Sequence, residues 1–252
     1  MKRKFILSLL IILTVAFAIG CNSNQPSLNP KDGESLNEKE EIKVETKTIS
    51  DDNEALQSTV SFPVFSSEKN QEALDEINKI FEEDALSIKE DLTEMAENDF
   101  ESFKKDNINF HKYELLIDYE IHTINNELIS ATSLNYQYTG GAHGMSVKVP
   151  YNFDLATGKR LSLNDLFKEG SNYTEVINKE VQKQIQENPD IFFPDEVELF
   201  SGIADDQSFY IKDGKLFIYF GQYDIAPYSS GIIEFEIPSS TLKNVATSSF
   251  IK

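Results

Sequence analysis

The chain has 252 residues, of which 43 are acidic and 23 are basic, so its formal net charge is −20 at pH 7. Phosphate binding needs a basic surface, so this balance argues against a nucleic-acid partner and favours cations or basic proteins. The same charge could also serve only to keep a surface protein soluble.

The N-terminus is typical of an exported lipoprotein. Three positive residues precede an apolar run from Phe5 to Phe17, and small residues then lead to Cys21. The run is shorter than the roughly 20 residues of a membrane span and ends in a cut site that resembles the lipobox of signal peptidase II substrates. We therefore expect residues 1–20 to be a lipoprotein signal peptide. An uncleaved N-terminal anchor is the alternative.

Cys21 is the only cysteine, so it suggests a lipid attachment point and leaves no possibility of a disulfide framework. Lipid such as palmitate on Cys21 would hold the protein at the extracytoplasmic face of the cell membrane. Removing residues 1–20 would change the formal charge from −20 to −23, because three basic residues are lost. Residues 21–41 are rich in Ser, Asn, Pro and Glu and predict a flexible linker.

The folded part is predicted to begin near Ile42. Alternating and β-forming residues indicate strands at 42–46 and 56–65. From about Glu68 to Lys105, apolar residues recur at three- and four-residue steps, which predicts one long helix or two helices joined by a kink. The other face of this helix is acidic, and a solvated surface explains it more simply than a basic partner does.

The second half alternates strands and helices. Strands are expected at 113–121, 128–138 and 147–153, helices at 162–165 and 172–187, a hairpin over 209–220 turning at Asp213–Gly214, and a last strand at 232–237. This order predicts an α+β fold with antiparallel sheets packed with helices, in two subdomains. We place the N-terminal module at 42–145 and the C-terminal module at 146–252.

The sequence carries no recognisable catalytic motif. It has no G-x-S-x-G, no H-E-x-x-H and no phosphate-cradling glycine loop, and no pair of carboxylates stands out as a glycosidase pair. His111, His122 and His143 are too far apart in sequence to suggest a metal site, and His122 is expected to be solvated on the polar side of its strand. We therefore predict no catalytic residue, no metal and no cofactor.

Two segments are candidates for contact with a partner. His143 sits among glycines, which let the backbone adopt positive φ or approach a ligand closely. The loop from Gly221 to Gly231 offers Tyr223, Asp224, Pro227 and Tyr228, and exposed aromatic residues are common at protein interfaces. Each segment also has a structural explanation: the glycines can serve the backbone alone, and the tyrosines can cover the end of the core.

Three stretches together resemble a known pair of extracellular modules, found in the anti-sigma factor RsiV and before the catalytic domain of the peptidoglycan deacetylase PdaC. They are Tyr138–Gly144, then Phe153–Lys159 with Leu163–Phe167, and finally Phe217–Phe220 with Tyr223–Gly231. The resemblance covers roughly residues 45 to 240. It implies an α+β extracellular fold with a PdaC-like N-terminal and an RsiV-like C-terminal module meeting near Gly144.

In RsiV the modules act as a receptor for lysozyme, which is a basic protein. The resemblance therefore implies a non-enzymatic binding module for lysozyme or another basic, cell-wall-related protein, and the acidic charge of this chain agrees with that. We expect neither a sigma-binding segment nor a deacetylase activity. The alternatives are an enzyme or enzyme accessory acting on peptidoglycan, and a structural lipoprotein of the envelope.

Overall fold

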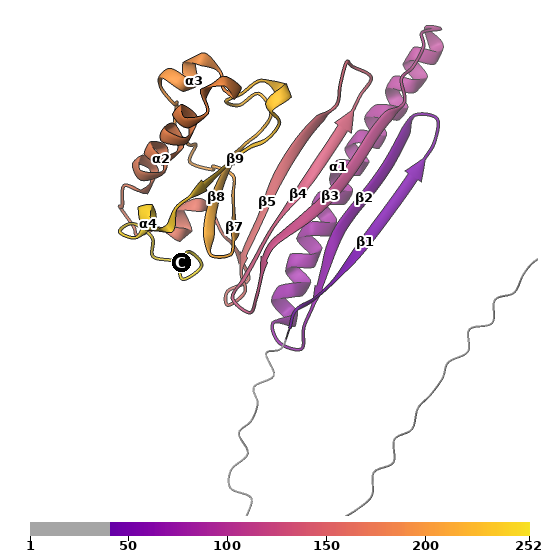
Figure 1. The fold of residues 1–252 in the computed structure, drawn as a ribbon. Coiled ribbons are helices and arrows are strands. Elements are labelled where there is room, and N and C mark those ends of the chain that lie inside the picture. Colours follow the sequence, from indigo (N-terminus) through magenta and orange to yellow (C-terminus); the bar gives the residue numbers. More distant parts are fainter. Residues whose placement is uncertain (1–40) are drawn as a thin grey trace, which may run out of the picture. The chain divides into compact units, whose positions relative to one another are not determined.

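The computed structural model describes residues 41–252, in which the strands form a six-stranded and a three-stranded sheet (Figure 1). Both sheets carry helices, so the predicted α+β class is confirmed. The expected signal peptide, Cys21 and nearly all of the linker lie outside the described residues.

The larger sheet has the strand order β1-β2-β3-β4-β5-β6. Its strands are β1 (Lys43–Asp52), β2 (Leu56–Ser66), β3 (Tyr113–Ile124), β4 (Leu128–Tyr138), β5 (Met145–Asp154) and β6 (Lys159–Arg160). All neighbours are antiparallel except β2 and β3. The expected antiparallel pairing therefore has one exception, because α1 (Gln71–Lys105) returns the chain to the same end of the sheet and makes the next strand parallel.

A single unbroken helix of 35 residues, α1, runs along the larger sheet (Figure 1), which decides between the one-helix and two-helix alternatives. Its apolar stripe is buried against the sheet, where Phe81 stacks on Tyr151 with ring centroids 4.1 Å apart. Full burial of a Leu, Ile or Phe side chain stabilises the fold by roughly 1.5–3 kcal/mol. The buried stripe comprises Leu74, Ile77, Phe81, Ala85, Leu92 and Ala96.

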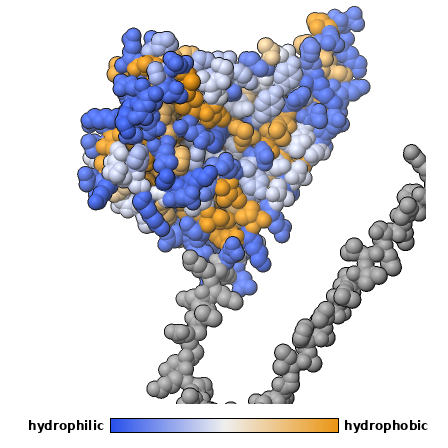
Figure 2. Space-filling view, viewed as in Figure 1, coloured by the Kyte–Doolittle hydropathy of each residue, from blue (hydrophilic) through white to orange (hydrophobic). Residues whose placement is uncertain are grey.

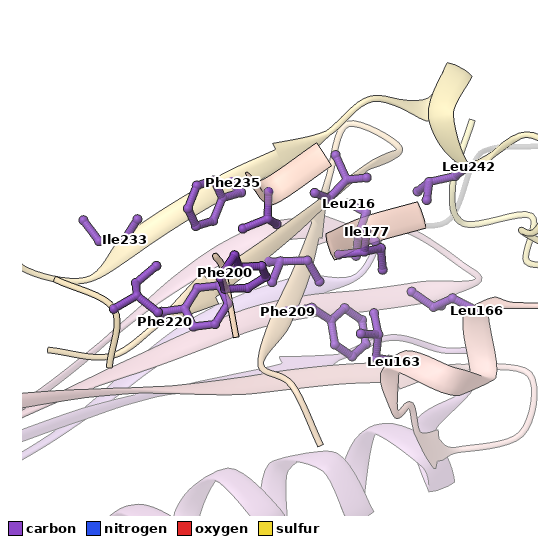
Figure 3. Close-up of a cluster of buried hydrophobic side chains, with 14 of the residues drawn as sticks. Leu163, Leu166, Ile177, Phe200, Phe209, Leu216, Phe220, Ile233, Phe235 and Leu242 are labelled. Carbon is purple, nitrogen blue, oxygen red and sulfur yellow. The ribbon is translucent and has the colours of Figure 1, made fainter. Parts of the chain in front are cut away.

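The smaller sheet has the order β7-β8-β9 and its own core (Figure 3). Its strands are β7 (Phe209–Lys212), β8 (Lys215–Phe220) and β9 (Ile233–Ile237), and the helical elements around it are η1 (Leu163–Leu166), α2 (Tyr173–Glu187), η2 (Pro189–Ile191), α3 (Pro194–Glu198), η3 (Tyr228–Ser230) and α4 (Ser239–Leu242). Ile177, Val181 and Ile185 of α2 are buried, as their spacing predicted. The sequence did not predict η2, α3, η3 or α4, which are too short to show a period.

Among the described residues, both cores are built from side chains between Ile42 and Ile251. The strand β5 begins at Met145 and belongs to the larger sheet, so this sheet extends past residue 145, the predicted end of the N-terminal module. No helix within residues 41–252 is long and apolar enough to cross a bilayer.

The two sheets meet along a polar seam in which side chains close strand edges. The short β6 pairs with only two residues of β5, so most of the outer edge of β5 has no neighbouring strand. Three side chains bind its backbone instead, and a fourth binds the residue just before it. These contacts are Tyr228 Oη to Gly144 O at 2.9 Å, Ser146 N to Gln222 Oε1 at 2.8 Å, Tyr219 Oη to Lys148 O at 3.2 Å and Arg160 Nη2 to Pro150 O at 2.6 Å.

The outer edge of β7 is closed in the same way by side chains of the larger sheet. Thr123 Oγ1 donates to Ile211 O at 2.8 Å, and Ser130 Oγ accepts from Ile211 N at 2.8 Å. Asn152 Nδ2 donates to Phe209 O at 2.9 Å. Buried polar groups must be paired, which explains why Ser130 and Asn152 are almost fully buried although neither is apolar.

Candidate binding surface

The loop between β8 and β9 is held in a tight turn that projects Tyr223. The Gly221 amide donates to the Asp224 carboxylate at 2.6 Å, and Gln222 is fixed by its contact with Ser146. Tyr223 has φ 70, a left-handed conformation that is unusual for an aromatic residue, and its side chain is half exposed. Such a residue persists only where its neighbours enforce it, and strained residues concentrate at functional sites.

The predicted contact residues His143 and Tyr228 lie against each other, although they are far apart in the sequence. Tyr228 also donates to the carbonyl of Gly144, the residue after His143, across a separation of 84 residues. The two rings stack with centroids 3.8 Å apart, and Tyr223 lies 5.8 Å from Tyr228. His143 Nδ1 is 3.1 Å from Gly144 O, the same carbonyl that accepts from Tyr228. We call His143, Tyr223 and Tyr228 the aromatic surface.

The two explanations of this loop apply to different residues within it. Ile225 and Ala226 are buried in the smaller core, and Tyr228 is half buried and hydrogen-bonded, so they hold the loop in place. Tyr223, Asp224 and Pro227 are exposed. The exposed members therefore offer contact area on a support made by the buried ones.

The backbone of Gly144 packs closely against the ring of Tyr136. A Cβ on this residue would lie 2.4 Å from the ring of Tyr136. Tyr136 pairs across the sheet with Leu116, which is 49% exposed, and these neighbours continue the apolar area next to the aromatic surface. On the face of the molecule seen in Figure 2, hydrophobic patches interrupt the hydrophilic surface.

A cleft of about 410 Å³, here called the seam cleft, lies beside this area. Three carboxylates, Asp118, Glu120 and Glu234, line it together with Lys148 and the apolar side chains of Leu134 and Ile232. Lys148 forms an ion pair with Glu234 and lies over the rings of Tyr210 and Tyr219, 4.8 and 5.3 Å from their centroids. Burial would raise the pKa of Glu234, but hydrogen bonds from Lys148 and Tyr210 outweigh burial and lower it.

The expectation that His122 is solvated was wrong. Only 8% of this residue is exposed, because its ring stacks on Tyr210 at 3.8 Å across the seam. Its Nε2 is 2.9 Å from Thr132 Oγ1, whereas Nδ1 has no hydrogen-bond partner and lies 3.4 Å from Glu120. Burial lowers the pKa of His122 from 6.5 to about 4, against the opposing effect of Glu120, so the ring is neutral at pH 7.

The strand pattern led to this error. His122 follows a register shift between Ile121 and Thr123, so simple alternation does not give its environment. Its burial also depends on a contact with β7, which lies far along the chain. His111 is exposed at the surface and takes no part in the seam contacts given above.

No group of three or more His, Cys, Asp or Glu side chains within residues 41–252 is arranged to hold a metal ion. Two carboxylates of the seam cleft are engaged with other side chains: Glu234 with Lys148 and Tyr210, and Glu120 with Lys212. The two ion pairs join side chains of the larger sheet to side chains of the smaller one.

Comparison with known proteins matches each half of the chain to a family. Residues 49–146 match the family described as "Deacetylase PdaC", and residues 164–240 match a protein family of unknown function, DUF3298. The peptidoglycan-N-acetylmuramic acid deacetylase PdaC of Bacillus subtilis is 30% identical over 212 residues, covering 82% of this chain and 43% of PdaC. The anti-sigma-V factor RsiV of the same organism is 28% identical over 195 residues, covering 74% of this chain and 64% of RsiV.

The chain thus spans less than two thirds of the length of either relative. Two solved structures of DUF3298 proteins share its fold. The protein from Bacteroides fragilis has a TM-score of 0.62 at 20% identity and covers 83% of this chain and 95% of its own. The protein from Pseudomonas aeruginosa has a TM-score of 0.59 at 18% identity and covers 83% and 96%.

Proposed function

Because the chain belongs to the PdaC/DUF3298 family, we propose that it is a membrane-anchored extracellular lipoprotein that acts as a binding module and not as an enzyme. Its partner in this proposal is a basic protein of the cell-wall environment, with lysozyme as the most concrete candidate. Lipid on Cys21 is the anchor.

The observation that carries the proposal is the aromatic surface. Tyr223 projects from a loop that four separate interactions hold in place, so little conformational entropy is lost when a partner covers it. Tyrosine supplies both apolar area and a hydroxyl, which is why it dominates many interface centres.

Charge supports a basic partner. The seam cleft next to this surface carries three carboxylates, and the chain as a whole has a formal charge of −20. A field of this sign accelerates the arrival of basic proteins and repels acidic ones. Within this class of partners, the similarity to RsiV makes lysozyme the first candidate to test.

Calorimetric titration of residues 22–252 with lysozyme tests the proposal, at low and at physiological salt. Specific binding should persist at physiological salt, because a desolvated aromatic contact is insensitive to screening. Binding only at low salt would reduce the interaction to charge attraction, and no binding at either salt would remove lysozyme as the partner.

The non-enzymatic part has its own test. Purified residues 22–252 should leave the muropeptide profile of peptidoglycan unchanged. An altered profile that a carboxylate variant such as Glu120→Gln abolishes would contradict the proposal and favour a peptidoglycan-acting enzyme. Crosslinking to a stable envelope partner, with no affinity for lysozyme or glycan, would favour the structural lipoprotein instead.

The anchor is tested in cells. The full chain should incorporate labelled palmitate and fractionate with membranes, and Cys21→Ser should abolish the label. If Cys21→Ser stayed labelled, the lipid would be attached elsewhere and this part of the proposal would fail.

A further inference from the structure

Two of the four outer strand edges in the described residues are closed by several side chains, and a third has one such contact. Tyr219, Gln222 and Arg160 bind the edge of β5, and Tyr228 binds Gly144 just before it. Thr123, Ser130 and Asn152 bind the edge of β7. At β9, Gln184 of α2 donates to Glu236 O at 2.9 Å. Closing an edge in this way prevents another strand from pairing with it.

The fourth edge is the outer edge of β1, where no such side-chain contacts are found in the described residues. This strand is ten residues long, and nine of the ten are exposed. Within residues 41–252 no side chain forms a hydrogen bond with the backbone of β1, and β2 is the only strand paired with it. A long open edge is a template for pairing with another strand.

The sequence of β1 is complementary to itself about a two-fold axis at Lys47. If two copies pair antiparallel with Lys47 opposite Lys47, then Lys43 of each copy faces Asp51 of the other. Residues opposite each other in this register share a face of the joined sheet, as a two-fold axis perpendicular to the sheet requires.

The remaining neighbours in this register are compatible. On the other face, Thr46 is opposite Thr48, a pairing that favours antiparallel sheets. The two lysines at the axis are each neutralised, because Lys47 forms an ion pair with Glu82 of α1 and Glu45 of the second copy lies on its diagonal. Shifting the strands by two residues in one direction would place Glu45 opposite Asp51, which is repulsive. The opposite shift would place Glu45 opposite Lys47, but it would pair only residues 43–49 of β1, whereas the proposed register pairs residues 43–51.

We propose that β1 is a self-association edge: two copies of this chain pair through their β1 strands, antiparallel and with Lys47 at the axis, and so join their larger sheets into one. The inference is independent of the partner proposed above, since β1 and the aromatic surface are formed by different parts of the chain.

Sedimentation velocity of residues 22–252 over a range of concentrations tests the association. This chain keeps both cores and lacks Cys21. We expect a reversible monomer–dimer equilibrium that Lys43→Asp shifts to monomer, because aspartate would then face Asp51 twice. The control Lys105→Asp makes the same charge change at the exposed end of α1 and should leave the equilibrium unchanged. A monomer at all concentrations would overturn the proposal.

Cysteine crosslinking tests the register. Single variants Thr46→Cys, Lys47→Cys and Thr48→Cys are compared under mild oxidation, with Thr174→Cys on the exposed surface of α2 as the control. Only residue 47 faces its own copy in the proposed register, so Lys47→Cys should form the disulfide-linked dimer fastest. Fastest crosslinking at residue 46 or 48, or rates no higher than at residue 174, would overturn the proposed pairing.

Discussion

Replacing Asn152 by leucine tests whether the polar seam holds the two sheets together. Asn152 is 1% exposed, accepts from Ser130 Oγ at 2.6 Å and donates to Phe209 O at 2.9 Å. Leucine has a similar size but neither function, so the buried Ser130 hydroxyl loses its acceptor and the buried Phe209 carbonyl loses its donor. Each orphaned group costs about 1–3 kcal/mol, so Asn152→Leu should lower the free energy of unfolding by about 2–6 kcal/mol.

Urea denaturation followed by circular dichroism measures this change, with Asn109→Leu in an exposed loop as the control. The double variant Asn152→Leu, Ser130→Ala should cost less than the sum of the single variants, because both belong to one hydrogen-bonded chain that ends at Ile211 N. A loss below about 1 kcal/mol for Asn152→Leu, or strict additivity, would refute the reasoning.

Three further predictions concern the surface beside this seam. Gly144→Ala should destabilise the fold by about 1–3 kcal/mol, because its Cβ would lie 2.4 Å from the Tyr136 ring, and Tyr136→Val should relieve that loss in thermal unfolding; a neutral Gly144→Ala would contradict the close packing. His122 has a folded pKa of about 4 against 6.5, so the unfolded chain binds its proton first, and the stability present above pH 6.5 falls as the pH drops to 4. His122→Gln should remove up to about 3 kcal/mol of that pH dependence in urea titrations, whereas the exposed control His111→Gln should retain it; equal slopes would show that His122 does not titrate in this way. Tyr228→Phe should cost about 1 kcal/mol through its lost bond to Gly144 O, while Tyr223→Ala should change stability by less than about 0.5 kcal/mol, and equal losses in thermal unfolding would place Tyr223 in the core.

The elements with a strong period were predictable from the sequence. The apolar steps of α1 and α2 and the alternation of β3 gave their type and buried faces, because one face of each packs on a core. The strand β1 was predicted only over residues 42–46, whereas it runs from Lys43 to Asp52, because a strand exposed on both faces has no apolar alternation to mark its length.

The candidate site was only partly predictable. Glycines and tyrosines singled out His143 and the loop after β8, and the structure brings His143 and Tyr228 into contact. The seam was missed, since Ser130 and Asn152 look like solvated strand residues until β7 is placed over them. Their burial depends on contacts 57 to 81 residues away in the sequence, which no local pattern records.

One comparison decides whether the exposed ring of Tyr223 forms part of a partner-binding surface. The affinity of residues 22–252 for lysozyme is measured by calorimetry at physiological salt for the unaltered chain, for Tyr223→Ala, and for Thr174→Ala as an exposed control. We predict a loss of about 2 kcal/mol, roughly 30-fold in Kd, for Tyr223→Ala and no change for the control. Equal affinities for the unaltered chain and Tyr223→Ala would contradict the claim.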